Sequence, residues 1–95
     1  MQKLLSLSFF LAASTALADV PQVATDIAPV HGLVSRVMQG VGTPELIVPA
    51  GATPHDFALR PSQARALQNA DLVVWMGPAL APWLDRTLDS LSLGA

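Results

Sequence analysis

The sequence contains no cysteine, and its only lysine is Lys3. The absence of cysteine excludes disulfides, thiolate metal sites and cysteine nucleophiles. After residue 18 all positive charges are arginines, and the aspartates and the one glutamate outnumber them. A mildly acidic chain without a basic stripe does not neutralise phosphates, which argues against nucleic-acid binding. The same charge balance is compatible with a cation as ligand.

The sequence also lacks an apolar run long enough to cross a membrane, which needs about 20 residues. Its N-terminal apolar run, residues 4–13, follows Lys3 and precedes Ala16-Leu17-Ala18. A positive residue, a short apolar run and an A-x-A motif are typical of a secretory signal peptide. We therefore predict a signal peptide over residues 1–18, cleavage after Ala18, and export to a bacterial periplasm. A lipoprotein anchor is excluded because no cysteine follows the apolar run.

Two kinds of apolar pattern alternate along the rest of the chain. Continuous apolar runs predict strands at residues 22–27, 46–48 and 71–76. Apolar residues at helical spacing predict helices that begin at Pro29 and Pro61, and a third helix over residues 80–91. The order β-α-β-α-β-α predicts an α/β fold with a parallel sheet and right-handed crossovers.

Each of these elements has a side that we expect to be buried. The third strand is apolar without alternation, which predicts a strand covered on both faces. In the second and third helices the predicted inner residues are Ala64, Leu67, Ala70, Leu80, Trp83, Leu84, Leu88 and Leu91. In the first helix one stripe, ending near Gly40 and Gly42, comprises Val30, Leu33, Val34, Val37, Met38 and Val41.

The loop Gly51–Ser62, with the sequence GATPHDFALRPS, is the most informative segment for function. It joins the second predicted strand to the second predicted helix, and such loops form the ligand crevice of an open parallel sheet. His55 lies within it, and a neutral imidazole is a natural ligand for zinc. From spacing alone, a solvated loop histidine is the simpler interpretation.

This loop, together with the run ADLVVWMGP at residues 70–78, resembles the metal-binding solute-binding proteins of bacterial ABC importers, and most closely their zinc-uptake branch. The resemblance extends from about residue 23 to residue 91, and its most specific part is H-D-F-x-L-R-P-S at residues 55–62. It implies that residues 19–95 form most of the N-terminal lobe of a longer, two-lobed periplasmic protein. It also implies that His55 is one metal ligand and that the others come from later parts of such a chain.

The resemblance further implies a role in transport rather than catalysis. A monomer would capture Zn²⁺ and deliver it to an ABC permease in the inner membrane, without making or breaking a bond. Two alternatives stay open. One is the manganese or iron branch of the same family, because hard oxygen ligands favour Mn²⁺ and imidazoles favour Zn²⁺. The other is a truncated remnant that binds no metal and acts only through protein contacts.

Four further residues near the predicted site are interpreted as follows. Asp56 could be a second ligand, but neighbouring side chains of an extended loop usually point apart. We therefore expect Asp56 either to orient the imidazole of His55 or to lie in solvent. His31 is interpreted as a surface or half-buried helix residue rather than a ligand. Asp26 ends the first strand and is expected to cap the following helix. Pro54 stands where some relatives carry an acid, which removes one auxiliary ligand.

Arg60-Pro61-Ser62 supports a rival interpretation, because a helix N-terminus beside an arginine can bind an anion. The interpretation that we favour is a structural salt bridge from Arg60 to Asp56. Trp75 and Trp83 are expected to be core and interface aromatics. The family resemblance would also place Trp83 near the ligand cleft.

Overall fold

Three short parallel strands form the centre of the protein, whose computed structural model describes residues 19–92, 94 and 95. They are β1 (Val23–Thr25), β2 (Glu45–Leu46) and β3 (Leu72–Val74). The sheet order is β2-β1-β3, with Ala24 of β1 opposite Glu45 on one side and Val73 on the other. β1 is therefore the central strand, and all three of its residues are buried.

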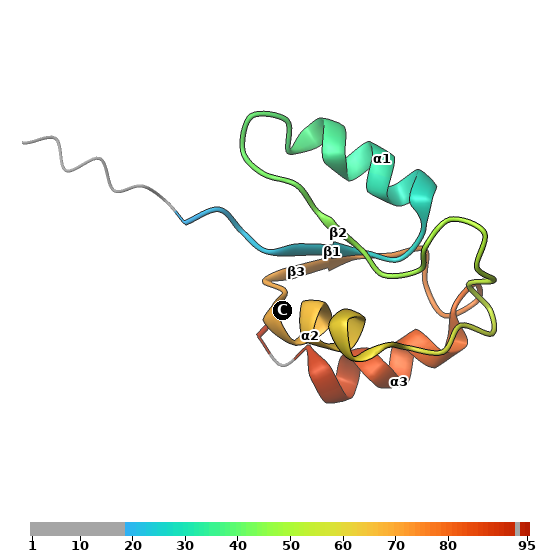
Figure 1. Ribbon diagram of the computed structural model, residues 1–95. Helices are drawn as coiled ribbons and strands as arrows, with labels where there is room; N and C mark the ends of the chain where they lie inside the picture. Colours follow the sequence, from blue (N-terminus) through green and yellow to red (C-terminus); the bar gives the residue numbers. More distant parts are fainter. Residues whose placement is uncertain (1–18, 93) are drawn as a thin grey trace, which may run out of the picture.

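The three helices cover both faces of this sheet. They are α1 (Ala28–Val37), α2 (Pro61–Asn69) and α3 (Pro82–Leu91), and each has a proline in its first two positions, where no backbone N–H is needed. Helix α1 lies on one face, and α2 and α3 lie together on the other (Figure 1). The predicted α/β fold, with β-α-β-α-β-α order and a parallel sheet, is confirmed.

The strands are shorter than the apolar runs that predicted them. Beyond β2, Ile47 and Val48 still donate backbone hydrogen bonds to the carbonyls of Thr25 and Asp26, at 2.9 and 2.8 Å. The expectation that the third strand is covered on both faces is wrong for the described residues. There α1 packs against β1 and β2, and Leu72 of the outer strand β3 is 54% exposed.

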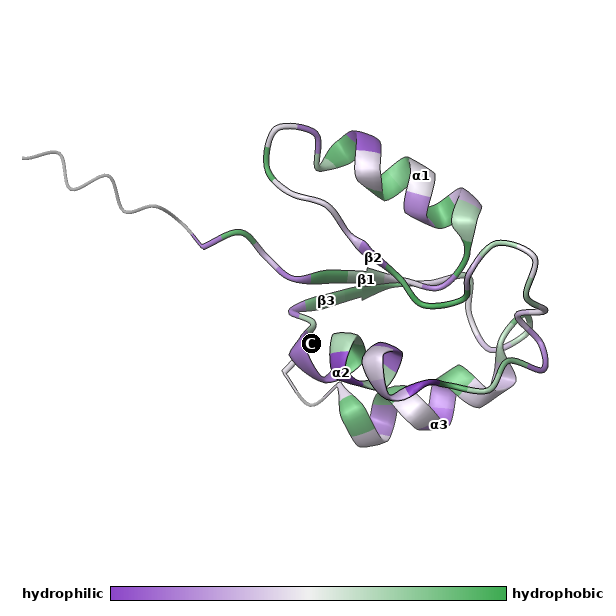
Figure 2. Ribbon diagram, in the orientation of Figure 1, coloured by the Kyte–Doolittle hydropathy of each residue, from purple (hydrophilic) through white to green (hydrophobic). Residues whose placement is uncertain are grey.

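The main hydrophobic core lies between the sheet and the pair α2 and α3. Figure 2 shows β1 and β3 coloured as hydrophobic, with α2 and α3 below them. The fully buried residues of this core include Leu67 of α2 and Leu84 of α3, each with no exposed surface. The predicted inner sides of both helices are thus confirmed. The complete buried cluster is Ala24, Ile47, Leu67, Ala70, Ala81 and Leu84.

Helix α1 is rotated relative to its predicted apolar stripe. Val30 is buried, as is Met38 just beyond the helix, but Leu33 is 69% and Val37 is 84% exposed. The side turned toward the sheet instead includes the half-buried His31 and Ser35. The i, i+4, i+8 row that starts at Val30 therefore makes the contact, and the flanking apolar residues stay in solvent.

The predicted signal peptide, residues 1–18, lies outside the described residues. Within the described part of the chain, no helix has the length and hydrophobicity needed to cross a membrane.

Candidate functional site

The loop of residues 49–60 leaves the sheet beyond β2 and leads into α2. Gly51 takes a φ of +87°, a conformation that side-chain-bearing residues rarely adopt, and it turns the chain after Pro49. A shallow groove of about 220 Å³ opens here, at the carboxyl ends of β1 and β2. Such a place is where an open parallel sheet binds its ligands. The groove is lined by Ile27, Ala28, Pro29, Val48, Pro49, Ala50, Gly51, Ala52 and Pro54.

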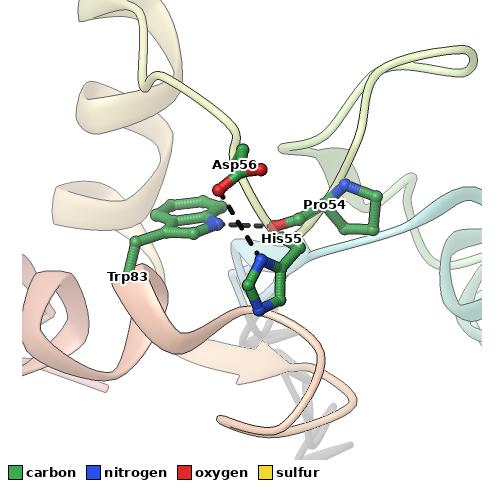
Figure 3. Close-up of polar contacts among 4 residues, drawn as sticks. All are labelled: Pro54, His55, Asp56 and Trp83. Carbon is green, nitrogen blue, oxygen red and sulfur yellow. Dashed lines mark hydrogen bonds and ion pairs between the residues drawn. The ribbon is translucent and has the colours of Figure 1, made fainter.

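His55 follows the last of these lining residues and is open to solvent. Its side chain is 63% exposed, and that of Asp56 is 86% exposed. The Nδ1 atom of His55 lies 3.6 Å from Oδ1 of Asp56 (Figure 3). The two side chains therefore meet, in contrast to the general expectation that neighbours in an extended loop point apart. The other ring nitrogen, Nε2, lies on the far side of the imidazole from this carboxylate.

Trp83, near the start of α3, contacts the same loop. Its indole N–H donates a hydrogen bond of 2.6 Å to the carbonyl of Pro54, the residue before His55 (Figure 3). Its ring also packs against Phe57, with the ring centroids 5.7 Å apart and the planes tilted by 50°. The predicted role of Trp83 as a core and interface aromatic fits its packing against the main cluster. No sequence pattern indicates the bond to Pro54.

The described residues do not by themselves form a complete metal site. Across residues 19–92, 94 and 95, no three His, Cys, Asp or Glu side chains come together closely enough to share an ion. A zinc site takes at least three protein ligands. His55 would therefore need partners from outside the described residues.

His31 has a structural partner within the fold. Its Nε2 atom lies 3.0 Å from the carbonyl oxygen of Pro44. This contact ties α1 to the segment that leads into β2. Nε2 of His31 is therefore used in a contact within the fold, and the interpretation of His31 as a residue that binds no metal stays a prediction.

Asp26 does not cap helix α1 through its side chain, so that prediction is wrong. The N-cap position is Ile27, and no side chain bonds the first-turn amides. Asp26 is fully buried, and its two carboxylate oxygens accept hydrogen bonds from the backbone N–H groups of Ile27 and Met76, both at 2.8 Å. It therefore joins the end of β1 to the segment that follows β3.

The predicted salt bridge from Arg60 to Asp56 is also wrong. Among the residues that the structure describes, Asp56 pairs only with His55. Arg60 is the N-cap of α2, and its backbone N–H donates to Oε1 of Gln63 at 2.7 Å. That donor is therefore already used, which weakens the rival interpretation of an anion site at this helix.

Comparison with known proteins agrees with the resemblance of the loop. A sequence profile of the family described as ZnuA, zinc-uptake complex component A periplasmic, matches residues 23–95. The chain belongs to this ZnuA family. The match includes every strand and helix of the structure as well as the His55 loop.

Curated relatives carry the name high-affinity zinc uptake system protein ZnuA. The chain is 54% identical over 81 residues to the protein from Paracoccus denitrificans, covering 85% of this chain and 25% of the relative. For the Brucella abortus protein the values are 44%, 77% and 22%, and for the Haemophilus influenzae protein 36%, 96% and 28%. The chain thus spans about a quarter of the length of these ZnuA proteins.

Solved structures support the same fold. The Zn(II)-bound ZnuA-like domain of AdcA from Streptococcus pneumoniae superposes with a TM-score of 0.66 at 25% identity, covering 77% of this chain and 27% of that one. The metal-dependent lipoprotein YcdH from Bacillus subtilis gives 0.69 at 24% identity, with coverages of 78% and 28%. The latter similarity shows the fold alone. The described residues therefore form part of a ZnuA-type α/β lobe.

Proposed function

We propose that this chain is part of the extracytoplasmic zinc-binding component of a high-affinity zinc ABC transporter, and that His55 supplies one ligand to the transported Zn²⁺. The observation that carries the proposal is the solvent-exposed His55 beside the carboxyl ends of the strands, with Asp56 at 3.6 Å. Membership of the ZnuA family and the names of the relatives support the metal and the transport role.

The chemistry of the loop fits zinc capture. An imidazole binds a metal through one nitrogen in its neutral form, while a carboxylate commonly holds the other nitrogen. Asp56 faces Nδ1 of His55, which leaves Nε2 as the atom for the metal. Asp56 then orients the ring and is not itself a ligand.

The second part of the proposal concerns the whole protein and rests on membership of the ZnuA family. Residues 1–18 act as a signal peptide, and residues 19–95 form part of an N-terminal lobe whose metal site is completed by segments outside this sequence. The protein works as a monomer in the periplasm and hands Zn²⁺ to a permease in the inner membrane. It binds and releases an ion without catalysing a reaction, so it is not an enzyme.

Two other functions compete with this one. The first is manganese binding, because the same fold occurs in a manganese-bound protein. The Mn-bound periplasmic metal binding protein from Candidatus Liberibacter asiaticus superposes on this chain with a TM-score of 0.67 at 22% identity. The imidazole of His55 favours Zn²⁺ over Mn²⁺, which prefers oxygen ligands. A remnant that binds no metal would retain the fold but lack the remaining ligands.

Zinc titration calorimetry with a competing chelator tests the proposal. It would compare residues 19–95 with any longer product of the same gene, and each with its His55→Ala variant. Tight one-to-one binding by the longer product, lost in the variant, supports the importer component. No binding by either length supports the remnant. Tight binding by residues 19–95 alone would contradict a single-ligand site, and a stronger response to Mn²⁺ would select the manganese branch.

A further inference from the structure

Among the described residues, the loop of residues 49–60 makes few hydrogen bonds to the rest of the protein, while its Phe57 and Leu59 pack against the main core cluster. Within the loop, Ala52 bonds back to Pro49, and at its end Gln63 bonds to Arg60. Among the described residues, one hydrogen bond joins this loop to an element distant in sequence. It is the bond of 2.6 Å from the indole N–H of Trp83 to the carbonyl of Pro54.

The contacts of Trp83 lie on both sides of His55 in the sequence. The hydrogen bond holds Pro54, the residue before His55, and the tilted ring contact at 5.7 Å holds Phe57, two residues after it. Figure 3 shows the indole of Trp83 beside the loop, at the carbonyl of Pro54, and the imidazole of His55 extending from the next residue. Helix α3 thus fixes the short segment that carries His55.

We propose that Trp83 is the positioning residue for His55: it fixes the loop backbone so that the exposed imidazole is presented to the metal in one place. The inference rests on the proposed role of His55 as a ligand. A ligand atom must lie within about 0.2 Å of the preferred distance from its metal. An irregular loop that is free to move would also lose conformational entropy each time it binds. Anchoring the loop in advance reduces this loss.

The bond to Pro54 distinguishes Trp83 from Trp75, the other tryptophan of the chain. Both side chains are half-buried, and both pack against the main core cluster. In the part of the chain that the structure describes, Trp75 makes no contact with the His55 loop comparable to that of Trp83. A change from Trp to Phe removes the same atoms at both positions, so Trp75→Phe is a matched control.

The test compares Trp83→Phe and Trp75→Phe in the protein purified from the periplasm of cells that carry the whole gene. Zinc affinity is measured by competition with a chelator. We expect Trp83→Phe to weaken zinc binding by about tenfold, as for other residues that support a metal ligand, and Trp75→Phe to weaken it by less than about twofold. Equal affinities of the two variants would overturn the inference.

Nuclear magnetic resonance of the metal-free protein separates positioning from general stability. In Trp83→Phe the backbone amides of residues 53–57 should become mobile on the nanosecond timescale, whereas in Trp75→Phe they should stay ordered. If Trp83→Phe fails to fold, hydrogen exchange of the Trp83 indole N–H in the unaltered protein decides. Exchange slowed relative to free indole supports the bond, and exchange as fast as in free indole overturns the inference.

A third variant distinguishes failure of this inference from failure of the proposed function. If His55→Ala binds zinc as tightly as the unaltered protein, His55 is not a ligand, and both proposals fail. If His55→Ala loses zinc while Trp83→Phe keeps it, the proposed function stands and the positioning role of Trp83 is wrong.

Discussion

The buried carboxylate of Asp26 accepts a hydrogen bond of 2.8 Å from the backbone N–H of Met76, fifty residues further along the chain. Its second oxygen accepts from Ile27, so both oxygens are used. Asp26 ends the central strand, and Met76 follows β3. The contact therefore links the ends of β1 and β3, at the end of the sheet where the His55 loop lies. It connects the stability of the fold to the region where the ligand is expected.

Asp26→Asn should destabilise the fold. The side-chain amide has one acceptor oxygen, so its buried NH₂ group would face the backbone N–H of Ile27 or Met76. Leaving such groups unpaired costs about 3 kcal/mol in the free energy of unfolding. Asp71→Asn is the control, because Asp71 also accepts a backbone N–H, from Gln22, but is exposed. Asp71→Asn should lower the free energy of unfolding by less than about 1 kcal/mol. Urea unfolding measures both, and equal losses would contradict the importance of Asp26.

His55→Ala should weaken zinc binding by tenfold or more. Loss of a group that only supports a metal ligand costs at least about tenfold in affinity, and loss of the ligand itself should cost no less. His31→Ala should change zinc affinity by less than about twofold, while losing about 1 kcal/mol of stability through its bond to Pro44. Chelator competition and urea unfolding measure the two quantities. If His31 matters for zinc as much as His55, the choice of ligand is wrong.

Asp56→Asn should reduce zinc affinity by about tenfold, near the lower end for a carboxylate that orients a ligating imidazole, because the pair is exposed to solvent. The comparison is Asp89→Asn, an equal change of charge on the exposed side of α3. A similar small loss in both variants would show that Asp56 acts through overall charge and not through contact with His55.

Gly51→Ala and Gly32→Ala should change stability in opposite directions. A Cβ atom would meet nothing within 4 Å at either position, so only the backbone differs. Gly51 has a φ of +87°, where alanine costs about 1 kcal/mol. Gly32 lies within α1, where alanine is favoured by about 0.5–1 kcal/mol. Thermal unfolding of both variants checks the signs, and destabilisation by Gly32→Ala would be unexpected.

Mass spectrometry of the exported protein tests the signal peptide. We expect the mature chain to begin at Asp19, after the A-x-A motif of residues 16–18. A substitution of Ala18 by Phe should block cleavage and leave the longer form attached to the membrane. An N-terminus far from Asp19 would contradict the predicted processing.

The sequence predicted the fold well where one local signal is enough. Pro61 marks the start of α2 as predicted, Pro29 lies in the first turn of α1, and the apolar runs locate all three strands. It predicted strand lengths less well, since hydrophobicity continues at Ile47 and Val48 after the regular ladder ends. The stripe of α1 was misplaced because periodicity indicates which residues share a side but not how the helix rolls on the sheet.

The candidate site was predicted less completely, because several of its contacts involve backbone groups. The loop and its resemblance select His55 and Asp56, which are neighbours in the sequence. The partners of Asp26 and Trp83 are backbone groups, and Arg60 itself takes part through its backbone N–H. A backbone carbonyl or N–H has no residue-type signature. Nothing in the sequence therefore indicates that Trp83 bonds to Pro54, or that Gln63 occupies the N–H of Arg60.

The contact between Trp83 and the His55 loop has an optical consequence. Indole emission responds to the polarity and motion of its surroundings, and Trp83 lies half-buried against a loop that is open to water. The sequence has two tryptophans, so Trp75→Phe leaves Trp83 as its single fluorophore. The intensity and wavelength of its emission would then follow the state of the loop in real time, without an attached dye.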